Sequence, residues 1–420
     1  MNVKTYAASD AVTCWEDIDF HLAETHVKKL QAQIAKAHKA GESKKVLSLQ
    51  HKLIHSFYAK ALSVKMVTTN KGKRTPGIDG ILWITPEDKW QAVLSLNRRG
   101  YHPKPLKRSY IQKPNGQRRL LGIPTMRDRA MQTLYRLALE PVAEITGDYH
   151  SYGYRHGRSA REAIIRCADV LSKPPFPRWI LKADIQSCFN NINHKWVMEH
   201  IPMDKVMLQK FLQSGYIDKS QRYHALRGIP QGSSISPVIC NMVLDGLEQE
   251  LQTRFFPETQ FVRYADDFLV IGENKDTLEQ SVIPLIKDFL KKRELELAPE
   301  KTFITHIADG FDFLGWHVYQ RGKQLTIIPS RRNAASLLCK IHDVLIHDTQ
   351  RLPDEICKRV KPTILGWLNY HRGIVLKYSL YEMEFDVVSM MYDLTGDRHL
   401  SELISLFFSS AQVGRRCTCT

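Results

Sequence analysis

Two apolar segments of this sequence carry aspartate residues into surroundings where a charge is costly. One run ends at Asp184, and the other, residues 261–271, has the adjacent pair Asp266 and Asp267 in its middle. Buried carboxylates need a cation. Hard oxygen ligands that leave coordination positions open suit Mg²⁺, and two such ions stabilise the attacking and leaving oxygens of a phosphoryl displacement. These residues indicate metal-assisted phosphoryl transfer; the alternative is that the acids lie at exposed strand ends.

The carboxylates must be positioned by strands. Residues 179–184 form a short apolar run after a proline-rich break, which predicts a buried strand that delivers Asp184 to a site at its end. Neighbouring residues on a strand point to opposite faces, so Asp266 and Asp267 can face one site only from a turn. We therefore expect a β-hairpin with this pair at its tip.

Two basic segments precede these strands. Residues 107–113 and 118–121 lie on either side of Pro114-Asn-Gly, which predicts a basic β-hairpin with a tight turn. Residues 68–80 combine glycines, a proline and cations. Such a loop can approach a phosphate backbone closely or, equally, be a solvated connection between domains.

Length and charge describe a large, basic, folded protein. The chain has 420 residues, 60 Lys and Arg against 44 Asp and Glu, and a net charge of +16. This composition predicts two or three domains with a positive field and a polyanionic partner. No apolar run approaches the roughly 18 residues of a membrane span, and the N-terminus lacks a signal-peptide pattern. We expect a cytosolic protein without a membrane partner.

The cysteines indicate a reducing compartment. The spacing of the eight cysteines does not indicate a disulfide framework, and most of them are isolated within apolar or helical stretches, as reduced thiols are. Cys417 and Cys419 have no second pair or histidine pattern nearby, so a frayed tail is favoured over a zinc site.

Helical periodicity frames the chain at both ends. From 17 to 67, apolar residues recur on one face on either side of Gly41, which predicts two helices joined by a short turn. From 330 onward the pattern is again helical. The expected organisation is a helical arm, a mixed α/β centre and a helical C-terminal domain.

Five segments resemble the catalytic motifs of reverse transcriptases. Tyr264-Ala-Asp-Asp267, flanked by apolar residues, resembles motif C. The other four follow in the family's order: residues 184–194 for motif A, 228–237 for motif B, Lys301 for motif D and 313–316 for the primer-grip motif E. A lone match of four residues would be weak, but the ordered set implies an RNA-directed DNA polymerase.

The resemblance narrows to the bacterial group II intron type. Residues 75–80 resemble its motif zero, 118–132 motif 1, 152–159 motif 2 and 366–373 the thumb or X signature. The likeness implies an α+β right-hand polymerase with fingers, a palm built on an antiparallel sheet and an α-helical thumb. The expected divisions are an N-terminal helical arm (1–75), fingers (76–182), palm (183–325) and thumb with a short tail (326–420).

The resemblance also implies roles for single residues of motifs A and C. Asp184, Asp266 and Asp267 become the catalytic acids and the ligands of two Mg²⁺ ions, with the backbone carbonyl of Ile185 as a further ligand. Phe189 matches the aromatic residue that closes on the sugar 2′ position and excludes ribonucleotides by a steric clash. The alternative for Phe189 is a core aromatic.

Further residues would bind the incoming nucleotide. Lys113 and Arg119 flank the turn of the fingers hairpin and would hold the triphosphate, with Arg118 as the substitute if the register slips. Gln231 and Gly232 would let the backbone pass close beneath the nucleotide and its template base.

Motifs D and E and the thumb carry assignments with open alternatives. Lys301 would orient or protonate the leaving phosphate, or else be a solvated surface lysine. Leu314 and Trp316 would support the primer end, or belong to the core. Trp367 and Tyr370 lie on an expected helix, where packing is favoured over RNA contacts.

The chain departs from longer intron-encoded proteins after the thumb signature. No Cys/His nuclease array follows, and residues 377–402 are acidic where an RNA-gripping thumb should be basic. We expect a reverse transcriptase in a group II intron-related or antiphage-defence role in the bacterial cytoplasm. Its expected partners are a specific structured RNA template, a DNA or RNA primer and dNTPs, and the oligomeric state stays open. The alternative is a maturase that binds and folds a group II intron RNA for splicing and mobility.

Overall fold

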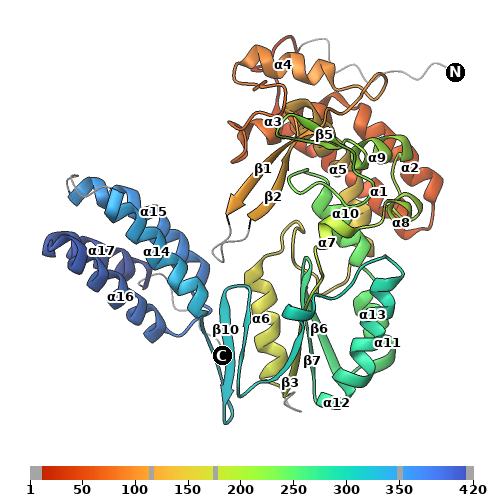
Figure 1. The fold of residues 1–420 in the computed structure, drawn as a ribbon. Coiled ribbons are helices and arrows are strands. Elements are labelled where there is room, and N and C mark those ends of the chain that lie inside the picture. Colours follow the sequence, from red (N-terminus) through yellow and green to blue (C-terminus); the bar gives the residue numbers. More distant parts are fainter. Residues whose placement is uncertain (1–11, 113–117, 174–177, 348–352, 413–420) are drawn as a thin grey trace.

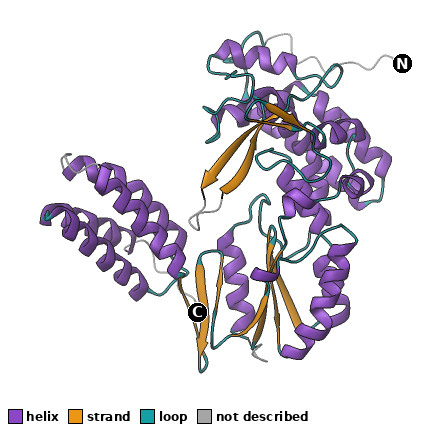
Figure 2. Cartoon of the chain, viewed as in Figure 1, coloured by secondary structure: helices purple, strands orange, loops and turns teal. Residues whose placement is uncertain are grey.

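The computed structural model describes residues 12–112, 118–173, 178–347 and 353–412. N-terminal helices and a small sheet form the upper part, a second sheet covered by helices forms the lower part, and a helical bundle stands to one side (Figure 1). Figure 2 shows that the strands lie in the upper and lower sheets and beside the bundle, whereas the bundle itself and the N-terminal part are helical. Among the described residues, no helix combines the length and hydropathy that a membrane crossing requires.

The N-terminal arm has three helices where the periodicity predicts two. α1 (Phe20–Lys39) begins at the N-cap Asp19, and α2 (Ser43–His55) follows a turn at Gly41, which has a φ of +73°. Ser56 then separates α2 from α3 (Phe57–Thr69), a break that apolar spacing does not reveal because the apolar stripe continues across it. These helices pack on α5 (Met126–Thr146), and α4 (Pro86–Ser95) begins at a capping box.

The fingers sheet has the strand order β2-β1-β4-β5. β1 (Leu106–Gln112) and β2 (Arg118–Ile123) form the expected antiparallel hairpin. β4 (Tyr216–Asp218) and β5 (Gln221–Tyr223) were not expected from the sequence; β4 joins the start of β1 in parallel.

The palm sheet has the order β6-β7-β3-β8 and is antiparallel throughout: β6 (Thr259–Tyr264), β7 (Asp267–Gly272), β3 (Trp179–Asp184) and β8 (Phe303–His306). Its side chains alternate between two cores, as a period of two requires. Ile180 and Leu269 belong to the core that contains α6 (Ala160–Leu171), whereas Leu181 and Phe268 belong to the core that contains α10 (Ser236–Leu244), α11 (Leu247–Phe255) and α13 (Ile283–Lys291). The sheet is thus covered on both faces.

Short elements complete the palm and its surroundings: α7 (Cys188–Asn191), α8 (His194–His200), α9 (Lys205–Leu212), α12 (Lys275–Thr277), η1 (Leu278–Val282) and η2 (Pro299–Lys301). A three-stranded sheet then leads to the thumb: β9 (Phe311–Phe313), β10 (Trp316–Arg321) and β11 (Gln324–Pro329). The thumb consists of α14 (Arg331–His347), α15 (Pro353–His371), α16 (Lys377–Thr395) and α17 (Arg398–Gln412).

The expected fold class is confirmed. Fingers, an antiparallel palm and a helical thumb are all present (Figure 1). The domain boundaries stay predictions, and the one between 182 and 183 falls inside β3. The six cysteines within the described residues are free, as expected, whereas Cys417 and Cys419 lie outside them.

Candidate active site

The palm sheet brings the predicted acids to one end of two neighbouring strands. The β3–β7 ladder pairs Asp184 with Asp267, and the β6–β7 ladder closes with Tyr264 opposite Asp267. Ala265 and Asp266 therefore form a two-residue turn, as expected for a hairpin with the acids at its tip. Ala265 has a φ of +58°, a conformation that costs a residue with a Cβ free energy and that the surroundings must hold.

Asp267 is buried and carries an unused acceptor. Among the described residues, its Oδ1 has no hydrogen-bond partner. The pKa of Asp267 is raised to about 6, chiefly by burial; the charges of Asp184 and Asp266 also raise it, and those of Lys182 and Lys301 oppose the rise. The three carboxylates are thus close enough to affect one another, and the site is short of positive charge.

Lys301 lies at Asp184. Its Nζ is 2.6 Å from Oδ2 of Asp184, and this hydrogen bond raises the pKa of the lysine. The backbone N–H of Ala298 donates to the Asp184 carbonyl at 2.8 Å, which holds the segment carrying Lys301 against the end of β3. More than half of the Lys301 side chain is nevertheless exposed, so its assignment to the leaving phosphate stays a prediction beside the alternative of a surface lysine.

The carbonyl of Ile185 faces away from the segment that carries Leu297. Ile185 pairs with Leu297 in an isolated antiparallel bridge, and the two flanking hydrogen bonds run from Ala298 N to Asp184 O and from Gln186 N to Glu296 O. In this kind of pair the N–H and C=O of the central residue face away from the partner strand. The carbonyl therefore faces the side on which β7 lies.

These groups fit a divalent cation, although no ready-made cage exists. In the part of the chain that the structure describes, no group of three or more His, Cys, Asp or Glu side chains is clustered as metal ligands are. The Lys301 ammonium instead takes the counter-ion's place at Asp184. The unused oxygen of Asp267, the neighbouring carboxylates and the Ile185 carbonyl are the kind of hard oxygen donors that Mg²⁺ takes. Metal ligation stays a prediction.

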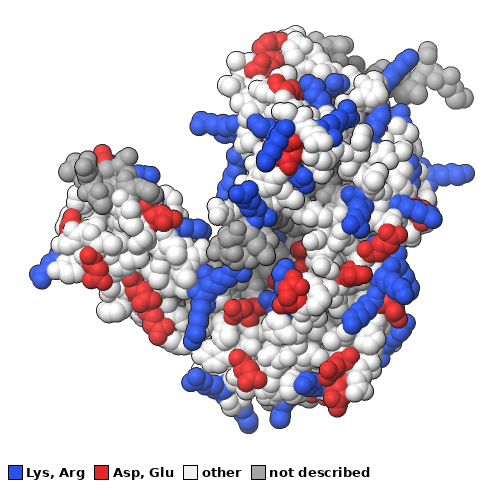
Figure 3. Space-filling model, viewed as in Figure 1, with Lys and Arg blue, Asp and Glu red and all other residues white. Residues whose placement is uncertain are grey.

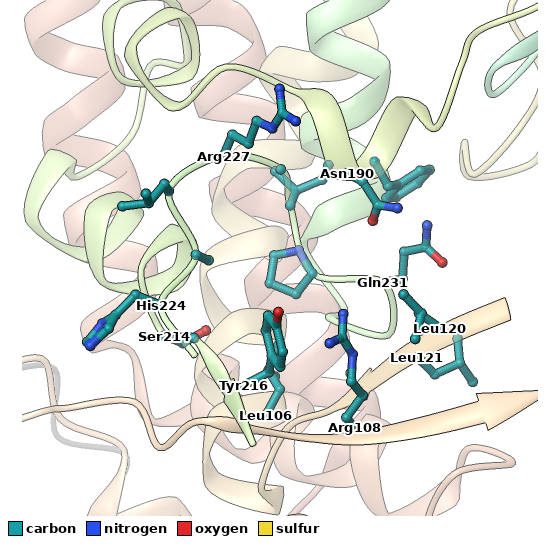
Figure 4. Close-up of a pocket in the computed structure, with 18 residues that line it drawn as sticks. Leu106, Arg108, Leu120, Leu121, Asn190, Ser214, Tyr216, His224, Arg227 and Gln231 are labelled. Atoms are coloured by element: carbon teal, nitrogen blue, oxygen red, sulfur yellow. The ribbon is translucent and has the colours of Figure 1, made fainter. Parts of the chain in front are cut away.

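Phe189 lies beside a cavity of about 340 Å³ between the fingers and the palm. The cavity is lined by β1, β2 and residues 214–216 at the start of β4, by Phe189 and Asn190 of α7 and by the loop of residues 224–231. Figure 4 shows Gln231 beside Leu120 and Leu121 of β2, and Arg108 beside Tyr216. Phe189 is 8 % exposed, so the predicted gate is both a wall of the cavity and part of the core.

Gly232 permits a close approach of two chain segments. It has a φ of +112°, and a Cβ there would lie 2.4 Å from the carbonyl oxygen of Gly122 in β2. The Gly122 N–H donates to the Gln231 carbonyl at 2.7 Å. The motif B loop is therefore fixed directly to the fingers strand, whereas the predicted passage of Gln231 and Gly232 beneath the nucleotide stays a prediction.

The triphosphate residues are only partly described. Lys113 lies outside the described residues, as does the side chain of Arg119, whose backbone pairs with Ile111. Arg118 is described, and its guanidinium lies 6.0 Å from the Tyr110 ring centroid. The triphosphate assignment stays a prediction.

Two positively charged side chains near the site, those of Lys182 and Arg108, were not predicted from the sequence. Lys182, two residues before Asp184 on β3, shares its face and donates to the Asp312 carbonyl at 2.7 Å. Arg108 stacks on Tyr216 at 3.8 Å and lies 3.7 Å from Asp218. The period-two alternation could have indicated Lys182, whereas nothing in the sequence pairs β1 with β4.

Comparison with known proteins agrees with this geometry. Residues 111–318 match the family "Reverse transcriptase (RNA-dependent DNA polymerase)", and residues 15–96 match "N-terminal domain of reverse transcriptase". The chain belongs to the reverse transcriptases. The two matches together cover most of the N-terminal arm, the fingers except residues 97–110, the palm sheet and β9 with the first half of β10.

Curated relatives of this reverse transcriptase include intron-encoded proteins. Protein YkfC of Escherichia coli is 29% identical over 68% of this chain and 89% of its own length. Group II intron-encoded protein LtrA of Lactococcus lactis is 28% identical over 60% of this chain and 53% of its own length. A solved Candida tropicalis telomerase aligns at 12% identity over 76% of this chain and 68% of its own, with a TM-score of 0.44, too loosely to carry an argument. The chain thus spans about half of LtrA.

The thumb signature of this reverse transcriptase binds the motif E turn. Leu314 and Gly315 connect β9 to β10 with φ values of +50° and +87°, as in a type I′ turn. The Tyr370 hydroxyl donates to the Leu314 carbonyl at 2.7 Å, and its ring stacks on Trp316 at 4.5 Å. The fully buried Trp316 thus belongs to the core, whereas Tyr370 packs on it but stays 39 % exposed, so the preference for packing over RNA contacts at Tyr370 stays a prediction.

A second contact of the same signature lies at the start of the thumb. Oδ1 of Asn333 in α14 accepts from Trp367 Nε1 at 2.6 Å and pairs with His371 Nε2 at 2.9 Å. Trp367 and His371 are both buried. The predicted preference for packing over RNA contacts at Trp367 is therefore confirmed.

Proposed function

We propose that this chain is an RNA-directed DNA polymerase that makes cDNA by nucleotidyl transfer with two Mg²⁺ ions. The observation that carries the proposal is the ladder that sets Asp184 of β3 opposite Asp267 of β7, with Asp266 in the adjoining turn. The reverse transcriptase family match and the intron-encoded relatives support the same activity.

In this proposal, Asp184, Asp266, Asp267 and the Ile185 carbonyl hold the ions. When bound, the ions lower the pKa of the primer 3′-hydroxyl and neutralise charge on the leaving pyrophosphate. Lys301 must leave Asp184 for this, and the departing ammonium then lies where it can orient or protonate the leaving phosphate.

The nucleotide would occupy the space in front of the acids, with its sugar against Phe189. The burial of Phe189 fixes the ring, so a ribose 2′-hydroxyl would clash instead of displacing it. Gln231 and Gly232 would lie beneath the base, and Lys113 and Arg119 would hold the triphosphate. The template would be a structured RNA, with a DNA or RNA primer.

Primer extension tests this proposal. The purified chain should extend a DNA primer on an RNA template with dNTPs and Mg²⁺, and Asp266→Asn with Asp267→Asn should abolish extension while the protein stays folded. Asp309→Asn, an aspartate in the turn after β8, is the matched control and should retain activity. Extension by the double variant, or none by the wild type on any primer and template, would contradict the proposal.

A maturase is the second candidate, because several relatives are named as intron-encoded or maturase-like proteins, including Maturase-like protein 1 of Euglena longa at 25% identity over 86% of this chain. The acidic residues of the thumb disfavour extensive RNA binding on this surface, because carboxylates repel the phosphates of RNA. Figure 3 shows Asp and Glu gathered on the thumb, and Glu382, Asp386 and Asp393 of α16 are exposed.

Sequencing of copurifying nucleic acids separates the two roles. We would compare wild type with the Asp266/Asp267 double variant, from bacteria with and without phage infection. One enriched structured RNA with matching cDNA, lost in the variant, supports the polymerase and a defence or intron role in the bacterial cytoplasm. Intron RNA without cDNA in either preparation supports the maturase.

A further inference from the structure

Arg263 of β6 carries a fully buried guanidinium three residues before Asp266. Its Nη2 lies 2.5 Å from Asp245 and 3.3 Å from Asp148, and its Nη1 lies 3.3 Å from Oδ1 of Asn241. Nη1 also approaches the carbonyl of Ala265, the first residue of the acidic turn, at 3.5 Å. The side chain is 0 % exposed, so none of these contacts is shared with bulk solvent.

The contacts of Arg263 join three separate segments. Asp245 follows α10, the helix that begins directly after the motif B loop, and Asn241 lies within it. Asp148 precedes motif 2, and its Oδ1 accepts the Gly246 N–H at 2.8 Å. One guanidinium therefore ties the catalytic hairpin to α10 and to residues 148–153.

The backbone repeats the same connection. Ser151 and Arg263 form a parallel bridge, in which the Arg263 N–H donates to His150 O at 2.9 Å and the Tyr152 N–H donates to Arg263 O at 2.8 Å. A Cβ on Gly153 would lie 2.5 Å from the Ala265 nitrogen, so this segment touches the turn itself. Asn241 Nδ2 donates to the Gly153 carbonyl at 2.8 Å and closes the network.

This arrangement is better suited to fixing geometry than to adding stability. Desolvation of a buried ion group offsets most of its attraction, so such groups contribute little net stability against apolar replacements. A planar guanidinium with several donors, however, permits only one arrangement of its acceptors. The strained φ of Ala265 needs such a constraint, because the turn would otherwise relax and move Asp266.

We propose that Arg263 is a positioning residue that holds the Ala265–Asp266 turn in register with α10, so that the motif B loop and the catalytic acids keep one relative placement. The inference rests on the proposed polymerase function. It assigns Arg263 no contact with substrate or metal; the residue acts through Asp266.

Arg263→Lys tests the proposal, since it keeps the charge and removes the fork. We expect kcat for dNTP incorporation to fall about 100-fold, the scale for a misplacement of roughly 1 Å, with the KM for dNTP nearly unchanged. Binding of Mn²⁺ by the protein alone, followed by electron paramagnetic resonance of the free ion, should weaken. Hydrogen exchange should rise in the peptide spanning residues 264–268.

Arg293→Lys is the matched control. Arg293 is partly buried and donates to the carbonyl of Val243 in α10 at 2.6 Å and to the carbonyl of Phe289 in α13 at 2.9 Å, and neither acceptor lies at the catalytic turn. Asn241→Ala is a second test that leaves the ion group intact and removes both the Nη1 acceptor and the donor to Gly153. It should shift Mn²⁺ binding and exchange in the same direction as Arg263→Lys.

The outcomes separate the inference from the function. Loss of thermal stability in Arg263→Lys and Asn241→Ala, with wild-type kcat, Mn²⁺ binding and exchange at residues 264–268, would overturn the positioning role and leave the polymerase standing. An inactive wild type that still shows the Mn²⁺ and exchange effects would overturn the polymerase alone. Equal effects in Arg293→Lys would also overturn the positioning role.

Discussion

Acidification should destabilise the contact between α14 and α15 of the thumb through His371. This residue is fully buried, its Nε2 pairs with Asn333, and among the described residues its Nδ1 has no partner. Protonation would place a charge on an atom without an acceptor, so burial lowers the pKa of His371 to about 4.

The sign and size of the effect follow from linkage. The unfolded chain, with a histidine pKa of about 6.5, binds the proton more readily than the folded protein between about pH 6.5 and 4, so stability falls as the pH falls through this window. The full difference corresponds to about 3 kcal/mol, of which about 2 kcal/mol is lost by about pH 5. Other groups add their own dependence, so a variant must isolate this one.

Urea unfolding of wild type and His371→Gln at about pH 7.5 and about pH 5 measures the contribution. Gln can still donate to Asn333 but does not titrate. The free energy of unfolding of the wild type should fall by about 2 kcal/mol more than that of the variant between the two conditions. Equal losses in both proteins would refute the reasoning.

Three further substitutions test single contacts. Phe189→Ala should admit ribonucleotides in primer extension, and unchanged sugar selectivity would contradict the gate. Gly232→Ala should lower the free energy of unfolding by about 1–3 kcal/mol and raise the KM for dNTP, because the new Cβ would lie 2.4 Å from the Gly122 carbonyl oxygen. The control is Gly396→Ala, at positive φ with open space around it, which should lower the free energy of unfolding by about 1 kcal/mol and leave the KM unchanged. Tyr370→Phe removes the hydroxyl from Leu314 O and should cost about 1 kcal/mol in thermal unfolding and shorten processive cDNA; wild-type product lengths would show that the hydroxyl does not orient the thumb.

Local pattern was sufficient for the parts of the site that lie on single strands. The apolar runs around Asp184 and Asp266 predicted a strand and a hairpin because alternation and burial act over a few residues, and both are present. The ladder that places Asp184 opposite Asp267 depends on pairing between segments about 80 residues apart, and the family resemblance was needed to expect it.

Contacts between distant segments were beyond the sequence. Arg263 has the composition of an ordinary strand residue, and only the fold brings Asp148 and Asp245 to it. The same holds for Tyr370, whose aromatic ring indicated packing but not its acceptor at Leu314. The break at Ser56 within a predicted helix was also missed, because a single residue in extended conformation leaves the spacing of the apolar residues unbroken.

The parallel pairing of β4 with β1 has a consequence for synthesis of the chain. Leu106 and Lys107 find their partners at Tyr216 and Ile217, which lie beyond motif A of the palm. A nascent chain therefore carries an unfinished fingers sheet until much of the palm has left the ribosome, and an open strand edge invites pairing with other chains. Fragments that end before residue 223 should aggregate, so we expect that the fingers of this protein cannot be separated from its palm by cutting the gene between them.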